Sequence, residues 1–358
     1  MTTDTVGGVF TYSTELAAEL TGREAEVAIV TFGREPSDDQ RRQLARAGVE
    51  RVVETELALE WMPEPWRDLA TAERLLLELE RELASDVVHL NAFAHGGAPF
   101  RAPALVVGHS CVFSWWAAVH GSAPSQDWDR YRTVVRRGLA GAAAVVAPTR
   151  TMLSELKRCY GPLRGPAQVI LNGSGVAETA GLTGRDPIVL GSGRLWDEAK
   201  NAAALHRVAR RPALRDRVLL AGESGDGAAE AGAARLLGRL ASERLAELRR
   251  RATVYAAPAR YEPFGLGILE AARDACALVL GDIPSLRELW NGAGLFVDPD
   301  DDAGLGDTLE MLLAHPNAAA AWGRRARERS RAYDAAAMGE AYLDLYGRLS
   351  AAEGMFAA

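Results

Sequence analysis

Lysine is nearly absent from this 358-residue chain, since Lys157 and Lys200 are the only two among its 41 basic residues. This scarcity fits a coding sequence rich in GC codons, and it makes each lysine that is kept slightly more interesting. The chain is acidic overall, with a net charge of −7 and a pI of about 5.6. Because nucleic-acid-binding domains are usually basic, we predict no nucleic-acid partner.

Cysteine is also scarce, and Cys111, Cys159 and Cys276 lie far apart in apolar contexts. They show neither metal-ligand spacing nor a disulfide framework, which favours a reducing compartment. Met1 is followed by polar residues rather than by a signal peptide, and no apolar run approaches the roughly 20 residues of a spanning helix. We therefore expect a cytoplasmic protein. A peripheral contact with the inner membrane face stays open, because a small patch suffices for it.

Short apolar runs rich in valine and isoleucine alternate with longer helical patterns. Unbroken apolarity predicts strands buried on both faces, as in parallel sheets. The helical pattern at residues 69–83 repeats its leucines and alanine at helical spacing. The predicted strands cover residues 27–32, 51–54, 86–90, 104–108, 144–147 and 168–171, and then 188–191, 218–222, 253–257, 277–281 and 294–297. The alternation predicts an α/β, doubly wound fold.

The two series of strands predict two Rossmann-like domains, over residues 1–175 and 186–333, joined by a Gly- and Thr-rich linker. A C-terminal helical segment at residues 334–358 has one apolar face and can pack on either domain. A strand should precede Gly7-Gly8, but only six residues are available there. The first strand is thus very short, or missing with the native start upstream, and we expect a weak centre in the N-terminal sheet.

The strongest motif is Glu-Pro-Phe-Gly-Leu-Gly-Ile-Leu-Glu at residues 262–270, between a predicted strand and a predicted helix. A glycine loop lets backbone N–H groups approach a ligand, and a helix N-terminus favours phosphate. Carboxylates such as Glu262 and Glu270 accept hydrogen bonds from sugar hydroxyls. The alternative is a surface glutamate and a glutamate that merely favours the first helical turn.

The second motif is Gly-Ser-Gly-Arg-Leu at residues 191–195, followed by Lys200-Asn201. The cations Arg194 and Lys200 stand just after a predicted strand, where they can neutralise a diphosphate. The alternative is a pair of ordinary surface charges. A dinucleotide-binding fingerprint is disfavoured, because the third glycine and the distant acidic residue are missing.

Polar residues also follow predicted strands in the N-terminal half, where ligands of parallel sheets bind. They are Asn91 and His109, with Trp115 nearby as a surface on which a sugar can stack, and the glycine turn at Gly8 is a further candidate. Each has a structural alternative, namely a simple turn, a hydrogen-bonded core histidine or a buried aromatic ring.

The glutamate pair separated by seven residues, with its internal Phe-Gly, resembles the donor-site signature of the family four retaining glycosyltransferases, which have the GT-B architecture. The resemblance implies parallel sheets that face a central cleft and a nucleotide diphosphate sugar as donor. It implies that Glu262 contacts sugar hydroxyls and that Glu270 binds the ribose. It assigns sugar contacts to the backbone of Phe264, Gly265 and Leu266. The family often has proline where this chain has Gly267.

The resemblance extends to the other motifs and implies a set of catalytic residues: Glu262, His109, Arg194 and Lys200. Arg194 and Lys200 match the residues that clamp the donor diphosphate, and Gly8 matches a turn that meets the donor phosphate or the acceptor. The segment that ends at Leu240 resembles the stretch whose backbone reads the base. In this fold the N-terminal domain usually binds the acceptor, so Asn91 and Trp115 are the acceptor-side candidates.

The expected reaction is the retaining transfer of a sugar to an acceptor hydroxyl, with no obligatory metal or other cofactor, since no Asp-x-Asp triplet lies near a donor motif in the sequence. The acceptor stays open among a lipid-linked glycan, a polysaccharide, a small metabolite and a protein. The base, the sugar and the oligomeric state also stay open. The alternatives are a GT-B phosphorylase or epimerase, a nicotinamide-dependent oxidoreductase, and a nucleotide-sugar-binding protein without turnover.

Overall fold

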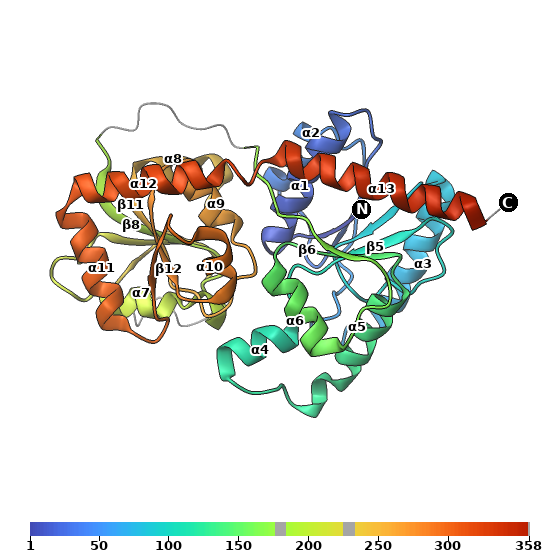
Figure 1. Cartoon of the computed structure of the whole chain (residues 1–358), viewed down its shortest axis with the longest axis horizontal. Helices are drawn as coiled ribbons and strands as arrows, with labels where there is room; N and C mark the ends of the chain where they lie inside the picture. The colour runs from blue at the N-terminus through green and yellow to red at the C-terminus, as the bar shows by residue number, and fades with distance from the viewer. Residues whose placement is uncertain (176–183, 225–232, 357–358) are drawn as a thin grey trace. The chain divides into compact units, whose positions relative to one another are not determined.

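The computed structural model describes residues 1–175, 184–224 and 233–356. The chain divides into two compact units, one formed by residues 1–173 with 335–358 and the other by residues 174–334 (Figure 1). Most of the predicted linker, residues 176–183, lies outside the described residues. Each unit is described separately below.

The first unit contains parallel strands in two sheets, of order β1-β2-β3 and β4-β5-β6-β7. Their bounds are β1 (Thr2–Asp4), β2 (Ala28–Phe32), β3 (Arg51–Glu54), β4 (Val88–Leu90), β5 (Ala104–Val107), β6 (Ala144–Ala147) and β7 (Ala167–Val169). The first strand is as short as predicted. The two sheets meet where β1 lies near β4 without a ladder, and there the Asn91 side chain donates to the Thr2 carbonyl at 2.8 Å. The Asn91 N–H also donates to the Thr2 hydroxyl at 2.9 Å, so the predicted weak centre is a break in the sheet bridged by two side chains.

Helices surround these strands: α1 (Gly8–Thr21), α2 (Asp38–Arg46), α3 (Trp66–Leu83), α4 (Val112–His120), η1 (Gln126–Trp128), α5 (Asp129–Gly141), α6 (Arg150–Tyr160) and α13 (Ala335–Phe356). The periodicity predicted for α3 buries Ala72, Leu76 and Leu79. The C-terminal helix α13 packs against α1, and Tyr346 Oη on it lies 2.6 Å from His89 Nδ1. The chain end therefore returns to the N-terminal unit, which settles the choice that the sequence left open.

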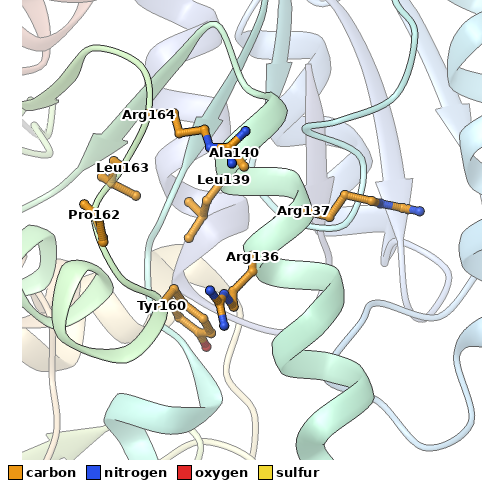
Figure 2. A pocket seen from close by; sticks show the side chains of 8 residues that line it. All are labelled: Arg136, Arg137, Leu139, Ala140, Tyr160, Pro162, Leu163 and Arg164. Carbon is orange, nitrogen blue, oxygen red and sulfur yellow. The ribbon is translucent and has the colours of Figure 1, made fainter.

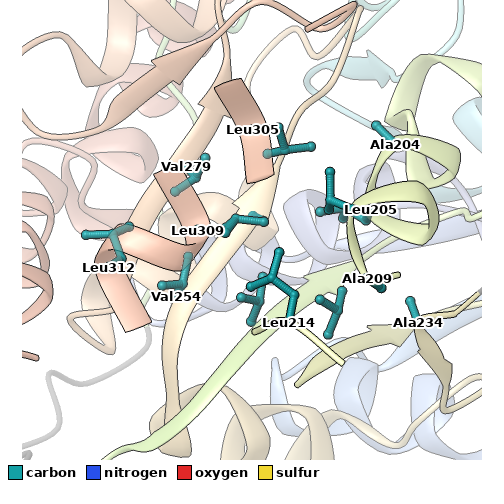
Figure 3. Close-up of a cluster of buried hydrophobic side chains, with 14 of the residues drawn as sticks. Ala204, Leu205, Ala209, Leu214, Ala234, Val254, Val279, Leu305, Leu309 and Leu312 are labelled. Carbon is teal, nitrogen blue, oxygen red and sulfur yellow. The ribbon is translucent and has the colours of Figure 1, made fainter. Parts of the chain in front are cut away.

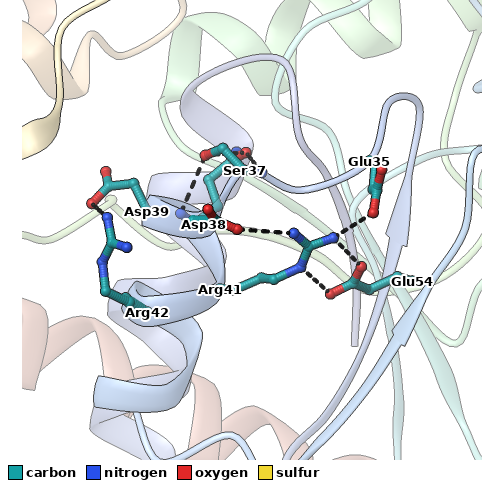
Figure 4. A network of polar contacts seen from close by, with 8 residues as sticks. Glu35, Ser37, Asp38, Asp39, Arg41, Arg42 and Glu54 are labelled. Carbon is teal, nitrogen blue, oxygen red and sulfur yellow. Dashed lines mark hydrogen bonds and ion pairs between the residues drawn. The ribbon is translucent and has the colours of Figure 1, made fainter.

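A capping box and an arginine fix α2 on the first unit (Figure 4). The Ser37 hydroxyl accepts from the Gln40 N–H at 3.3 Å, which satisfies a free donor of the first turn. Arg41 contacts Glu35 at 2.6 Å and Glu54 at 2.7 Å, so the helix is tied to the end of β3. Exposed ion pairs of this kind contribute little stability, roughly 0–1 kcal/mol each.

The second unit contains one parallel sheet of order β10-β9-β8-β11-β12-β13. Its strands are β8 (Asp186–Ser192), β9 (Val218–Ala221), β10 (Arg235–Leu236), β11 (Ala252–Ala257), β12 (Ala277–Gly281) and β13 (Leu295–Val297). Its helices are η2 (Glu198–Lys200), α7 (Ala202–Val208), α8 (Ser242–Arg251), α9 (Leu266–Arg273), α10 (Pro284–Trp290), α11 (Asp302–Ala314) and α12 (Pro316–Ser330). The two-residue strand β10 was not predicted.

Both faces of this sheet are covered, which explains why its strands are apolar without alternation. On one face, Val254 and Val279 pack with side chains of α7 and α11 such as Leu205 and Leu309 (Figure 3). On the other face, Leu190 and Leu278 pack with side chains of α9 and α10. The loops at the carboxyl ends of the strands are left to carry polar residues.

Candidate functional site

Residues from two neighbouring strands meet at the carboxyl edge of the second unit's sheet. Lys200 follows β8 and Glu262 follows β11, and these strands are adjacent. The Lys200 ammonium and the Glu262 carboxylate form an ion pair, with 25% and 17% of their side chains exposed. The structure thus joins two charges that are 62 positions apart in the sequence.

The loop that carries Lys200 is held by its neighbours. Asp197 accepts from the Ala199 N–H at 3.0 Å and pairs with Arg194 at 2.9 Å. Asn201 adopts a left-handed φ of +54°, which asparagine tolerates, and its amide donates to the carbonyls of Pro258 and Pro299 at 2.9 and 2.8 Å. Arg194 and Lys200 are therefore fixed on one clamped loop.

The loop from Glu262 to Leu266 is shaped by a glycine. Gly265 has a φ of +86° at the N-terminus of α9, and a Cβ there would lie 2.7 Å from Ile268 Cδ1. The Phe264 ring is buried and contacts Tyr333 edge-on, so only its backbone is left for a ligand. Leu266 is the first residue of α9. The Glu262 carbonyl accepts from the Ser285 hydroxyl at 2.6 Å, which ties the loop to α10.

Glu270, one turn into α9, belongs to a buried charge network. Its Oε2 lies 2.6 Å from Arg249 Nη1, and Arg249 Nε lies 2.9 Å from Asp274 Oδ2. Burial raises the pKa of Glu270, and the positive charge of Arg249 opposes that shift. Arg249 was not predicted, because it is one of three successive arginines at the end of α8 and no motif distinguishes it from its neighbours.

Leu240 follows β10 and is partly buried against the core of the second unit. The segment before it is held by backbone contacts, since the Gly222 N–H donates to the Gly238 carbonyl at 2.9 Å. The Gly193 N–H in turn donates to the Ala221 carbonyl at 3.0 Å. The segment predicted to read the base is thus tied by its backbone to the loop of Arg194.

His109, in the first unit, is a neutral histidine with a fixed tautomer. Its Nε2 lies 2.8 Å from Asn91 Oδ1, which can only accept, so Nε2 carries the proton and Nδ1 is an acceptor. Burial lowers the pKa of His109 to about 3. Asn91 also donates to the Ser13 hydroxyl at 3.1 Å, so its amide is largely occupied within the unit. The acceptor-side role of Asn91 stays a prediction.

The other candidates of the first unit occupy its α1 and α4 helices. Gly8 opens α1 and is exposed, after a turn in which Asp4 accepts from the N–H groups of Val6 and Gly7 at 2.9 and 3.1 Å. Trp115 on α4 is half-buried and meets Trp116 with a ring-centroid distance of 5.9 Å. Its role in stacking on a sugar stays a prediction.

An Asp-x-Asp triplet that is distant from the donor motifs in sequence contacts one of them in the structure. It is Asp298-Pro-Asp300, and the Asn201 amide donates to the carbonyl of its proline, so the premise that no such triplet lies near a donor motif holds along the sequence but not in the fold. The second carboxylate of the triplet pairs with Arg260. Across the described residues, no group of three or more His, Cys, Asp or Glu could hold a metal ion. The expectation of metal-independent chemistry stays a prediction.

A cavity of about 360 Å³ lies elsewhere in the first unit, between the ends of α5 and α6 (Figure 2). Arg136, Arg164 and Tyr160 line it, and none of the predicted site residues does. Arg137 also lines it and lies 3.9 Å from Glu73.

No helix in the described part of the chain is long and apolar enough to cross a membrane.

Known protein families and curated relatives match both halves of the chain. Residues 6–174 match the family model Glycosyltransferase Family 4, and residues 186–315 match the model Glycosyl transferases group 1. A glycogen synthase from Mycobacterium tuberculosis is 40% identical over 99 residues, which are 27% of this chain and 24% of that protein. An alpha-maltose-1-phosphate synthase from the same species is 32% identical over 122 residues, 32% of each chain. The matched segments thus span a quarter to a third of these relatives.

Solved structures resemble the whole chain. Sucrose-phosphate synthase from Thermosynechococcus elongatus has a TM-score of 0.79 at 20% identity, over 98% of this chain and 99% of that one. Anabaena HepE in complex with UDP and glucose has a TM-score of 0.73 at 15% identity, over 97% and 99%. These identities establish the fold alone. The chain has the GT-B fold and belongs to the glycosyltransferases, with a Family 4 model over its N-terminal half and a group 1 model over its C-terminal half.

Proposed function

We propose that this chain is a retaining glycosyltransferase that moves a sugar from a nucleotide diphosphate sugar to an acceptor hydroxyl. The observation that carries the proposal is the Lys200–Glu262 pair at the carboxyl edge of the second unit's sheet. Glu262 lies on the loop that opens α9, where Gly265 lets the backbone of the first turn approach a ligand. Cation, carboxylate and helix N-terminus together suit a sugar linked to a diphosphate.

In this proposal the second unit holds the donor. Arg194 and Lys200 balance the negative charge that develops on the leaving diphosphate, and such electrostatic stabilisation is typically worth about 2.7–4 kcal/mol per donor group. Glu262 accepts hydrogen bonds from sugar hydroxyls, and Glu270 accepts them from the ribose. The backbone at Phe264 and Leu266 meets the sugar, and the backbone before Leu240 meets the base.

The first unit holds the acceptor in this proposal. Neutral His109 offers Nδ1 to a hydroxyl, and Asn91 and Trp115 are the candidates for contacts with the acceptor. Gly8 is a further candidate on the donor side, where its turn meets the donor phosphate. The acceptor hydroxyl attacks the face from which the diphosphate leaves, so the anomeric configuration is retained. We propose UDP-glucose as the first donor to test, because HepE was solved with UDP and glucose.

We further propose a carbohydrate acceptor and a cytoplasmic location. The names of the matched relatives, a glycogen synthase and an alpha-maltose-1-phosphate synthase, support an acceptor of sugar type. The three cysteines are buried thiols and form no disulfide with one another, which fits a reducing compartment.

A transfer assay tests the proposal. The protein is incubated with UDP-, ADP- or GDP-glucose and with a glucan oligosaccharide or glucose 1-phosphate, and proton NMR reads the anomeric configuration of the new bond. The expected result is nucleotide release coupled to an α-linked product. A β-linked product would contradict retention. Tight nucleotide-sugar binding without transfer to any acceptor would favour a binding protein that has lost turnover.

A further inference from the structure

Arg249 is a buried cation of the second unit that the proposed reaction does not use. Only 4% of its side chain is exposed, at the end of α8. It binds Glu270 of α9 and Asp274, the residue that follows α9, with Nη1 2.6 Å from Glu270 and Nε 2.9 Å from Asp274. A buried charge is costly without partners, so removing this arginine would leave its two carboxylates as uncompensated buried charges.

The two carboxylates differ in access to solvent. The Asp274 side chain is 1% exposed and is enclosed, whereas the Glu270 side chain keeps 20% of its surface exposed. Arg249 holds one oxygen of Glu270, Oε2, and fixes the orientation of the other. Glu270 is therefore the member of this network that a ligand can reach.

We propose that Arg249 is a positioning residue that keeps Glu270 ionised and oriented to accept hydrogen bonds from both ribose hydroxyls of the donor. The inference rests on the proposed function, since it assumes that Glu270 meets the ribose. An ionised carboxylate offers only acceptors to a diol, whereas a protonated one must donate a hydrogen from one oxygen. Arg249 thus keeps the Glu270 carboxylate in the ionised form, which can accept a hydrogen bond from each of two neighbouring hydroxyls.

The groups around Glu270 act on its charge in opposite directions. Burial and the negative charge of Asp274 raise the pKa of Glu270, and Arg249 lowers it. Tyr255, which faces Glu270 from β11, stays neutral because burial raises its pKa to about 12. Arg249 is therefore the group on which the ionised form of Glu270 depends.

Two conservative variants test this dependence through binding of UDP-glucose by calorimetry between pH 5 and 8, since its diphosphate does not titrate in that range. Arg249→Met would bury two carboxylates without a cation and is expected not to fold, so Arg249→Lys is used. Lysine keeps a positive charge but lacks the fork with which Arg249 holds Glu270 and Asp274 through two different nitrogens, so Glu270 should ionise less readily and the loss of affinity at acidic pH should move upward. Asp274→Asn removes the charge that opposes ionisation and should move that loss downward. A merely structural role would weaken binding in both variants without moving the pH profile in opposite directions.

A second readout is the preference for ribose over 2′-deoxyribose in the same nucleotide sugar. Hydrogen bonds to a charged group support a preference of roughly ten-fold or more in the wild type. The ratio should fall toward one in Arg249→Lys. Arg250→Lys, the same exchange at an exposed neighbour on the same helix, should leave it unchanged.

The outcomes distinguish a failure of the role proposed for Arg249 from a failure of the proposed function. Wild-type binding of UDP-glucose with an unchanged ribose preference and pH profile in folded Arg249→Lys would overturn the role of Arg249 alone. Failure of the folded wild type to bind UDP-, ADP- or GDP-glucose would overturn the proposed function, and this inference with it.

Discussion

Lys200 is the residue whose replacement separates catalysis from stability most cleanly. Its ion pair with Glu262 is partly exposed, so Lys200→Ala should cost at most about 1 kcal/mol of folding free energy. The loss of one cation from the leaving group should lower kcat roughly 10²–10³-fold. Steady-state kinetics together with urea unfolding measure both quantities.

The second lysine of the chain provides the control. Lys157 is exposed in the last turn of α6, in the other unit, and Lys157→Ala removes the same charge. It should leave kcat within about two-fold of wild type, because Lys157 is an exposed surface charge and none of the predicted site residues. Near-wild-type turnover in Lys200→Ala would refute the catalytic role of that lysine.

Among single residues, those in glycine-containing loops after strands could be predicted from the sequence. Residues whose role depends on being buried by neighbouring elements could not. The ion pair of Lys200 with Glu262 follows from two loops on adjacent parallel strands, so both residues were identifiable. Arg249 looks like its neighbours Arg250 and Arg251, and only packing buries it. Its contact with Glu270 depends on how α8 lies against the sheet, which no local pattern encodes.

The loops after β8 and β9 touch through their backbones, and this contact makes a prediction for Gly222. A Cβ on Gly222 would lie 1.8 Å from the Gly193 carbonyl oxygen, and its φ of +143° is already unfavourable for other residues. Gly222→Ala should therefore cost clearly more than the roughly 1–2 kcal/mol of a left-handed alanine. Because Gly193 neighbours Arg194, donor affinity should fall as well.

Gly292→Ala is the matched control in the same unit. Gly292 also has a positive φ, +79°, but a Cβ there meets nothing within 4 Å. Gly292→Ala should therefore lower the free energy of unfolding only by the cost of holding an alanine at a positive φ. Equal urea midpoints for the two alanine variants would show that the contact between Gly222 and Gly193 does not constrain these loops.

Among the elements, the long apolar strands were predictable and the edges were not. Residues 144–147 are buried on both faces, so their apolarity marks them directly. The strand β10 has two residues and no periodicity that could reveal it. The break beside β1 was foreseen from the short N-terminal segment, but its bridging by Asn91 was not, because that asparagine looked like a ligand contact.

On the scale of whole units, buried histidines predict acid sensitivity in the first unit. Burial lowers the pKa of His95 to about 4 and that of His109 to about 3, and it holds the pKa of His89 well below its ordinary value. The unfolded chain takes up these protons near pH 6.5. The contribution of these neutral histidines to the free energy of unfolding is thus complete above pH 6.5 and is lost as the pH falls toward 4.

For His95 alone the loss between pH 7 and pH 5 is about 2 kcal/mol, given its depressed pKa. Urea unfolding at the two pH values should show a smaller drop in the His95→Gln variant than in wild type. His315→Gln, at an exposed histidine of the second unit, should not change the drop. An identical drop in wild type and His95→Gln would contradict a neutral His95 in the folded state.

The fold and the reaction class were predictable because strand alternation and the donor loop are local in sequence. The acceptor was not, because Asn91, one of the two residues predicted to face it, is engaged with His109 inside the first unit. The base stays open for a related reason, since the segment before Leu240 is held by backbone contacts that are nearly independent of side chains.

Thermal unfolding against UDP, GDP, ADP and their glucose conjugates tests the central claim of a nucleotide-sugar site most directly. A ligand at 100 times its dissociation constant should stabilise the folded protein by about 2.7 kcal/mol. We expect the unfolding temperature to rise with one nucleotide family. The rise should be smaller in Lys200→Ala and unchanged in Lys157→Ala. A folded wild type whose unfolding is unchanged by every one of these ligands would contradict the claim.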